Sequence, residues 1–267
     1  MAHPIYNQNL GLIGILAQSG TPTDCIVFTG ESGDFTLKAT YKEWNGTVEY
    51  STDHNTWTVW NGTAISSSNK KLYLRGSGNT TFCTSLGAQF ALSARAGCSG
   101  NLNTLLEYNN PPTELSTKHC YYSMFHGCTN LTTAPALPAT TLSDYCYQYM
   151  FYLCTGLTTA PALPATTLTT RCYQQMFYGC TSLTTAPALP ATTLAESCYN
   201  GMFYNCTAFK VSSTKTGSYQ YAWRIPTSGT ISSTPPYWNS NMLDGTGGTF
   251  ASSPSINTTY YVENEPV

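Results

Sequence analysis

A pattern of apolar and polar residues repeats along the middle of the chain. The phrase "LTTAPALPATTL" occurs at residues 131–142, 157–168 and 183–194 without a substitution. Cysteines recur with the same step of 26 residues and form two columns. The first column is Cys120, Cys146, Cys172 and Cys198, and the second is Cys128, Cys154, Cys180 and Cys206. Such a fixed period predicts stacked units, each of which buries its apolar face against its neighbours.

Each unit also contains the pattern Cys-Tyr-x-x-Met-Phe-x-x-Cys, as at residues 146–154. Its apolar residues recur at spacings of three to four, which predicts one face of a short helix directed into the core. Periods of roughly 20 to 29 residues built from a strand and a helical segment are typical of leucine-rich-repeat solenoids. The sequence therefore predicts an α+β repeat fold with a solenoid of 26-residue units.

Before the repeats, residues 35–75 alternate between apolar and polar side chains, as strands do. Asn45-Gly46 is a favoured hairpin turn, and it predicts pairing of residues 35–41 with residues 48–50. A further Asn61-Gly62 turn and the segment Leu72-Tyr73-Leu74 extend this region into a small antiparallel sheet.

These patterns divide the chain into four parts. Residues 1–34 are an N-terminal docking arm, residues 35–80 a small antiparallel β domain, and residues 81–209 the leucine-rich-repeat solenoid, with regular repeats at about 120–209. Residues 210–267 form a C-terminal cap, whose scattered aromatic side chains cover the open face of the last repeat. These aromatic residues are Tyr219, Tyr221, Trp223, Tyr237 and Trp238.

Composition limits the partners. Only 9% of residues are charged and the net charge is −2, so the chain has no basic field to hold nucleic acid or an anionic membrane. Thr, Ser, Asn and 20 Tyr must solvate the surface instead. Such neutral, amphipathic surfaces suit adhesion to sugars or proteins.

The apolar run Leu10–Ala17 is too short for a membrane span, and no Lys or Arg precedes it. We therefore expect no signal peptide, no membrane insertion and folding in a reducing cytosol. In that compartment the eleven cysteines are expected to be buried packing groups rather than disulfides.

The phrases "CYQYMFYLCTGLTTAPALPATTL" (146–168) and "CYQQMFYGCTSLTTAPALPATTL" (172–194) closely resemble BspA-like leucine-rich repeat proteins. The resemblance covers about residues 98–209, and residues 45–76 and 222–230 resemble segments that flank such repeats. It implies adhesion, in gut bacteria or their phages. The family usually has an aliphatic residue at the register of Cys146 and a cysteine at that of Cys154, which implies a structural role for both columns.

Bacterial members of the family are typically exported, whereas this chain shows no recognisable export signal or wall-sorting tail. We therefore expect a non-enzymatic phage surface or structural protein, such as a fibre, decoration or tail-associated protein. It would be made in the host cytoplasm, dock onto other virion proteins through residues 1–34 and attach to a glycan or protein of the host surface. The alternative is a bacterial cell-surface adhesin, and homo-oligomerisation is left open.

The sequence offers several candidate metal or catalytic residues, and each is better explained by packing or by a solvated turn. His119, Cys120, His126 and Cys128 have the residue types of a zinc site, but the next units keep both cysteines and lose both histidines. The thiols of those units also lack a base for nucleophilic catalysis. Asp53-His54 is expected to be a solvated turn. The sequence therefore assigns no catalytic residue, no metal ligand and no cofactor.

The candidate ligand face is a stripe of tyrosines along the repeats. His126, Tyr152, Tyr178 and Tyr204 share one register, and the stripe comprises Tyr145, Tyr149, Tyr152, Tyr178 and Tyr204. Ordinary packing at the rim is the alternative explanation. A second candidate face is the cap around Trp223, Tyr237 and Trp238. The repeated threonine pairs, such as Thr158-Thr159, are explained by β-propensity.

Overall fold

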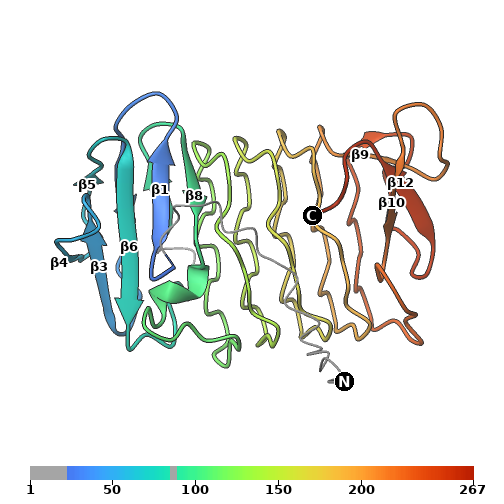
Figure 1. Cartoon of the computed structure of the whole chain (residues 1–267). Helices are drawn as coiled ribbons and strands as arrows, with labels where there is room; N and C mark the ends of the chain where they lie inside the picture. The colour runs from blue at the N-terminus through green and yellow to red at the C-terminus, as the bar shows by residue number, and fades with distance from the viewer. Residues whose placement is uncertain (1–22, 85–88) are drawn as a thin grey trace, which may run out of the picture.

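The computed structural model describes residues 23–84 and 89–267. Strands gather at the two ends of the molecule, and between them lies a stack of irregular coils (Figure 1). Two sheets stand at the N-terminal end and one at the C-terminal end. The tyrosine stripe lies on the coils between them.

The first sheet has five antiparallel strands in the order β4-β3-β6-β1-β8. The strands are β1 (Ile26–Gly30), β3 (Thr47–Ser51), β4 (Thr58–Val59), β6 (Lys71–Ser77) and β8 (Ala96–Ser99). Because β1 pairs with β6 on one side and with β8 on the other, it is an internal strand. Its Ile26 and Phe28 side chains are fully buried in the core.

The position of β1 changes the interpretation of the N-terminal segment. Residues 26–30 belong to a sheet and do not form part of a separate arm. The other part of the predicted docking arm, residues 1–22, lies outside the described residues. The docking role of residues 1–34 thus stays a prediction.

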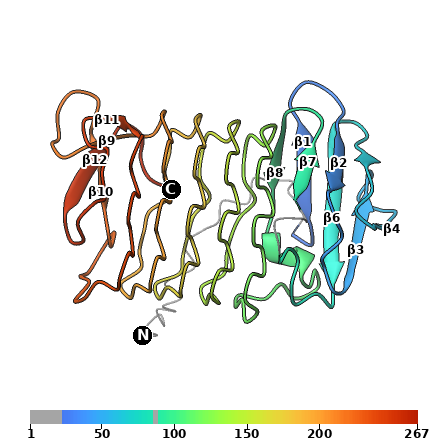
Figure 2. The same ribbon diagram turned by 180° about the vertical axis from the view of Figure 1, so that it is seen from behind.

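The second sheet has the order β5-β2-β7, with β2 (Thr36–Ala39), β5 (Ile65–Ser66) and β7 (Phe90–Leu92). Figure 2 shows β2 and β7 from behind. The predicted hairpin between residues 35–41 and 48–50 was wrong. β2 pairs with β5 and β7, whereas β3 pairs with β4 and β6. Leu37 of one sheet and Val48 of the other are both fully buried in one core cluster. Alternation identified the buried faces, but it does not specify which strand lies beside which.

The 26-residue units follow a short 3-10 helix, η1 (Leu102–Leu105), and stack with an offset of one unit. The backbone amide of Tyr147 donates to the carbonyl of Cys172 at 3.1 Å, and the amide of Phe151 donates to Met176 at 2.9 Å. On another side of the unit a parallel bridge joins Thr159 to Thr185. Each unit therefore supplies hydrogen-bond partners for the next.

The prediction of an α+β leucine-rich-repeat solenoid was wrong. The described residues contain no α-helix, and residues 145–153 form a run of turns. Every fourth residue there is left-handed, with φ of 63° at Tyr145, 60° at Tyr149 and 57° at Leu153. A right-handed helix cannot continue through such residues. Amides inside the run donate to carbonyls three residues earlier, as Met150 donates to Tyr147 at 3.2 Å, and they alternate with amides that bond the next unit.

Leu153 occupies one of the left-handed positions. The two neighbouring units have Gly127 and Gly179 at the same register, with φ of 70° and 69°. A left-handed L-residue costs roughly 1–2 kcal/mol, and the side chain of Leu153 is 40% exposed. Allowing for the greater unfolded-state freedom of glycine, we expect Leu153→Gly to raise the free energy of unfolding by about 0.5–1 kcal/mol in urea titrations.

The matched control for this prediction is Leu157→Gly, because Leu157 is fully buried and its φ is not positive. Losing its core contacts should lower the free energy of unfolding by about 2–5 kcal/mol. A lower free energy of unfolding in both variants would contradict the prediction that the left-handed backbone strains Leu153.

Aromatic ladders form the centre of the stacked units. Phenylalanine rings of successive units lie 5.5–5.6 Å apart, and tyrosine rings of a second ladder lie 5.9–6.0 Å apart. The ladders are Phe125, Phe151, Phe177 and Phe203, and Tyr121, Tyr147, Tyr173 and Tyr199. All eight side chains are buried, and one continuous core cluster runs from the first sheet to the last.

The last unit is covered by the C-terminal segment. Its sheet has the order β10-β12-β9-β11, with β9 (Lys210–Ser212), β10 (Tyr221–Arg224), β11 (Gly247–Gly248) and β12 (Thr259–Val262). Trp223 is buried with its ring 6.1 Å from Phe203, and Trp238 is buried with its ring 6.4 Å from Tyr199. Both indoles therefore close the end of the aromatic ladders.

Candidate functional site

Three of the predicted ligand-face tyrosines form one stacked column. Ring centroids lie 4.8 Å apart from His126 to Tyr152, 4.5 Å from Tyr152 to Tyr178 and 4.8 Å from Tyr178 to Tyr204. The planes are within 9° of parallel. All four side chains are half-buried. The column exists because the same turn recurs in each stacked unit and sets each ring directly on the previous one.

Tyr149 joins this column from the side. Its ring meets Tyr152 edge-on at 5.8 Å and meets Tyr122 edge-on at 5.5 Å. Tyr122 in turn lies edge-on to His119 at 5.3 Å. The left-handed backbone at Tyr149 belongs to the repeating turn geometry and directs this side chain across the unit.

Tyr145 completes the chain of contacts. It stacks on His119 at 4.6 Å with the planes 12° apart, and the Arg171 guanidinium lies 5.7 Å from the centroid of its ring. The structure thus brings all five predicted tyrosines together and adds three residues to them. We call the complete set the tyrosine face: His119, Tyr122, His126, Tyr145, Tyr149, Tyr152, Tyr178 and Tyr204.

The tyrosine face is electrically neutral near pH 7. Burial lowers the pKa of His119 and of His126, so both imidazoles are uncharged there. Burial and the neighbouring Tyr178 raise the pKa of Tyr152. Ion pairs lie at the margin, where Lys118 contacts Asp144 at 2.9 Å.

Stacking determines what this face can bind. Both faces of Tyr152 and of Tyr178 are covered by neighbouring rings of the column, so only the ring edges and the hydroxyl groups of these two residues are left to contact a partner. A sugar ring cannot lie flat on Tyr152 or Tyr178. Neutral hydrogen-bonding groups of a partner can instead meet a row of phenol hydroxyls held by rigid, stacked rings.

The predicted structural thiols lie in the core. All eleven cysteines are buried, and no disulfide joins them. The thiols of Cys154, Cys180 and Cys206 donate to the backbone carbonyls of the preceding unit at 2.9–3.0 Å. The four histidine and cysteine side chains weighed as a zinc set do not converge: His119 and His126 are stacked on tyrosines, while Cys120 and Cys128 are buried. Over residues 23–84 and 89–267, the one group of three side chains with metal-binding spacing is Asp24, Cys25 and His54.

The second predicted face is mostly inaccessible. Trp223 and Trp238 are 1% and 8% exposed, whereas Tyr237 is 70% exposed. Beside Trp223 lies a small hollow of about 210 Å³ that Arg224 and Glu265 also line. The cap thus exposes Tyr221 and Tyr237, while its two indoles are buried.

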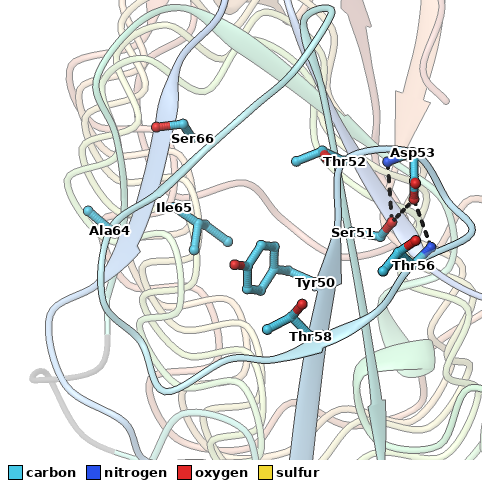
Figure 3. Close-up of a pocket in the computed structure, with 9 residues that line it drawn as sticks. All are labelled: Tyr50, Ser51, Thr52, Asp53, Thr56, Thr58, Ala64, Ile65 and Ser66. Atoms are coloured by element: carbon cyan, nitrogen blue, oxygen red, sulfur yellow. Dashed lines mark hydrogen bonds between the residues drawn. The ribbon is translucent and has the colours of Figure 1, made fainter.

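A pocket of about 410 Å³ opens between the β3–β4 loop and β5 (Figure 3). Six of its nine lining residues carry hydroxyl groups, and the ring of Tyr50 forms part of its wall. The Asp53 carboxylate accepts hydrogen bonds at 2.8 Å from the amides of Thr56 and Asn55 and from the Ser51 hydroxyl. These bonds stabilise the ionised form and lower the pKa of Asp53 to about 2. The Asp53 carboxylate therefore holds the β3–β4 loop in its conformation.

Comparison of the chain with protein-family models, with curated proteins and with solved structures gave no match. The resemblance to BspA-like proteins therefore rests on the repeated phrases and their flanking segments alone. No helix in the described part of the chain is long and apolar enough to span a bilayer.

Proposed function

We propose that this chain is a non-enzymatic phage surface or structural protein that attaches the virion to a neutral glycan or a polar protein surface of the host through the tyrosine face. The observation that carries the proposal is the continuity of that face. Eight half-buried aromatic side chains from successive units contact one another in an unbroken series.

The chemistry of the face favours a neutral partner. Charged residues are 9% of the chain, and both histidines of the face are neutral near pH 7, so long-range attraction contributes little. Binding would depend on several hydrogen bonds to hydroxyl groups, each worth about 0.5–1.5 kcal/mol. Stacked rings lose little conformational freedom on binding, which makes such weak contacts usable in combination.

The alternative is a bacterial cell-surface adhesin that uses the same face. The BspA-like resemblance supports either location. Detection of the protein in purified particles released by lysis, with genes for capsid, portal or tail proteins beside its own, would favour the virion. Detection in the cell envelope, with neighbouring export genes, would favour the adhesin.

The decisive variant is the triple substitution Tyr152→Phe, Tyr178→Phe and Tyr204→Phe, which removes three hydroxyl groups and keeps the stacked rings. We expect an unchanged melting temperature. We also expect retention on host cells, or on a glycan array, to fall at least about tenfold, since three neutral hydrogen bonds are worth about 1.5–4.5 kcal/mol together.

The matched control replaces the exposed tyrosines outside the face, with Tyr41→Phe, Tyr221→Phe and Tyr237→Phe. It should bind as the unaltered protein does. Equal binding by both triple variants would show that the tyrosine face is ordinary rim packing, and loss in the control alone would move recognition to the other surface.

A further inference from the structure

Three side chains with metal-binding chemistry meet at the edge of the five-stranded sheet. Asp24 and Cys25 directly precede β1, and His54 lies in the loop between β3 and β4. The carboxylate oxygen, the thiol sulfur and an imidazole nitrogen all lie within 4.8 Å of one another. The closest pair is His54 Nε2 and Asp24 Oδ1, at 3.0 Å. The imidazole is thus paired with Asp24, 30 residues away, and not with its sequence neighbour Asp53.

The loop holds His54 in this place by several contacts. Its backbone is left-handed, with φ of 63°, and its amide donates to the Ser51 hydroxyl at 2.9 Å. Its ring packs against Tyr73 of β6 at 5.1 Å and against Trp57 at 5.8 Å. The imidazole therefore crosses over β6 to reach the start of β1, with its orientation fixed from both sides.

We propose that Asp24, Cys25 and His54 form a binding site for a divalent metal ion of the zinc class. The three donors are a carboxylate oxygen, a thiolate and an imidazole nitrogen, each of which zinc accepts. Bond lengths of about 2.0–2.3 Å place the donors of a tetrahedral ion roughly 3.3–3.5 Å apart. Because the present donors lie within 4.8 Å of one another, no pair has to close by more than about 1.5 Å, which side-chain rotation can supply. The fourth position faces solvent, because Asp24 and His54 side chains are 39% and 36% exposed.

The charge of the cluster suits a divalent cation. The Asp24 carboxylate and the thiolate that forms when a metal displaces the Cys25 proton together supply two negative charges. The nearby Arg75 guanidinium is already paired with Glu49 at 2.9 Å and lies 4.0 Å from the centroid of the Trp57 ring. Its charge is therefore compensated by Glu49.

A nucleophilic role for Cys25 fits less well. Its side chain is fully buried, and burial together with the Asp24 charge raises its pKa to about 12. The thiol is protonated at neutral pH, which makes it a poor nucleophile. A bound metal would displace that proton, so metal affinity should increase with pH.

The bound metal would cross-link two segments of the sheet. In the sheet order, β6 separates β1 from β3, and a metal bound by residues on both sides of β6 joins two segments that share no hydrogen-bonded ladder. It would fix the point at which the chain enters the sheet after residues 1–22. This inference is independent of the proposed function.

The test is titration of the full, reduced, chelator-treated chain with Co²⁺. We expect one Co²⁺ per chain and a sulfur-to-cobalt charge-transfer band, which Zn²⁺ abolishes by displacement. Cys25→Ser should remove the band. His54→Asn and Asp24→Asn should each weaken binding by at least about 100-fold, since even partners outside the ligand set contribute about 10- to 100-fold to metal affinity.

Two control variants match these changes in residue type. His119→Asn alters another left-handed histidine, with φ of 59°, that stacks on Tyr145 outside the cluster. Cys154→Ser alters a buried thiol of the repeats. Both should bind Co²⁺ as the unaltered chain does, and melting curves check that every variant is folded. Asparagine tolerates the left-handed backbone, so His54→Asn still tests the site if Cys25→Ser does not fold.

The proposal is overturned if the unaltered chain gives no charge-transfer band with excess Co²⁺, or if the band persists in folded Cys25→Ser. It is equally overturned if folded His54→Asn and Asp24→Asn both bind with unaltered affinity.

Discussion

Raising the pH from 7 to about 9.5 is expected to unfold this protein. All eleven cysteines are buried without disulfides. Burial raises the pKa of ten of these thiols, including those of Cys120 and Cys128 to about 12. An unfolded-chain thiol ionises near pH 8.5. Because the folded pKa is the higher one, this stabilisation is complete below about pH 8.5 and is lost as the pH rises above it.

The size of the effect follows from the number of thiols. One pH unit above the unfolded-chain value, each buried thiol lowers the free energy of unfolding by about 1.4 kcal/mol. Ten such thiols amount to about 14 kcal/mol, which is comparable with the 5–15 kcal/mol that stabilise a typical protein. The buried tyrosines act in the same direction, since burial also raises the pKa of Tyr147 and Tyr173.

Urea titrations followed by circular dichroism between pH 7 and 10 measure this dependence. The control is the triple variant Cys154→Ser, Cys180→Ser and Cys206→Ser, whose hydroxyl groups can donate to the same carbonyls and do not ionise in this range. Above about pH 8.5 the free energy of unfolding of this variant should fall, per pH unit, by about three tenths less than that of the unaltered protein. A free energy of unfolding that stays constant from pH 8 to 10 would show that the thiols are not buried in solution.

The repeat predicted much of the core, because identical registers meet identical surroundings in stacked units. Cys146, Met150 and Phe151 are fully buried, and the variable residue Leu153 is 40% exposed. Positions whose residue differs between units are expected to be exposed. Gln148 is such a position, but its side chain is only 6% exposed. Its amide donates to the side chain of Gln174, so a polar column lies inside the stack.

The helix prediction failed because a spacing of three to four residues does not identify a helix uniquely. A run of turns with a left-handed residue at every fourth position places Cys and Met/Phe in the core at the same spacing. The sequence contains a signal against the helix. Gly127, Gly179 and Gly201 occur inside the supposed helical segments, all with positive φ. Glycine there is unfavourable for a helix and suitable for the left-handed positions.

The two candidate sites differ in how far sequence could predict them. Tyr152 and Tyr178 stack because they are one period apart, so their column was predictable. The contact between Tyr149 and Tyr122 depends on the turn geometry and was not. Asp24 and His54 belong to no repeat, and they meet only because β6 separates β1 from β3 in the sheet. Sequence spacing carries no information on that order.

Deleting residues 1–34 is expected to abolish the folded state. The deletion removes β1, which is hydrogen-bonded to β6 and to β8. It also removes the fully buried side chains of Ile26 and Phe28. Truncating one buried Ile or Phe costs about 2–5 kcal/mol, and losing both with two ladders exceeds the stability of a typical domain. Circular dichroism and gel filtration should show an unfolded or aggregated chain. A separate docking arm at residues 1–34 would instead leave a folded, soluble protein after this deletion.

Deleting residues 1–22 is the matched experiment, because it removes none of the described strands and keeps Asp24, Cys25 and His54. This shorter deletion should unfold cooperatively, with a melting temperature close to that of the full chain. It then provides the test of docking that the longer deletion cannot. Loss of incorporation into particles by a folded chain lacking residues 1–22 would support the docking role, and normal incorporation would refute it. If the chain lacking residues 1–34 also folds with an unchanged melting temperature, β1 contributes nothing to the sheet and its internal position is wrong.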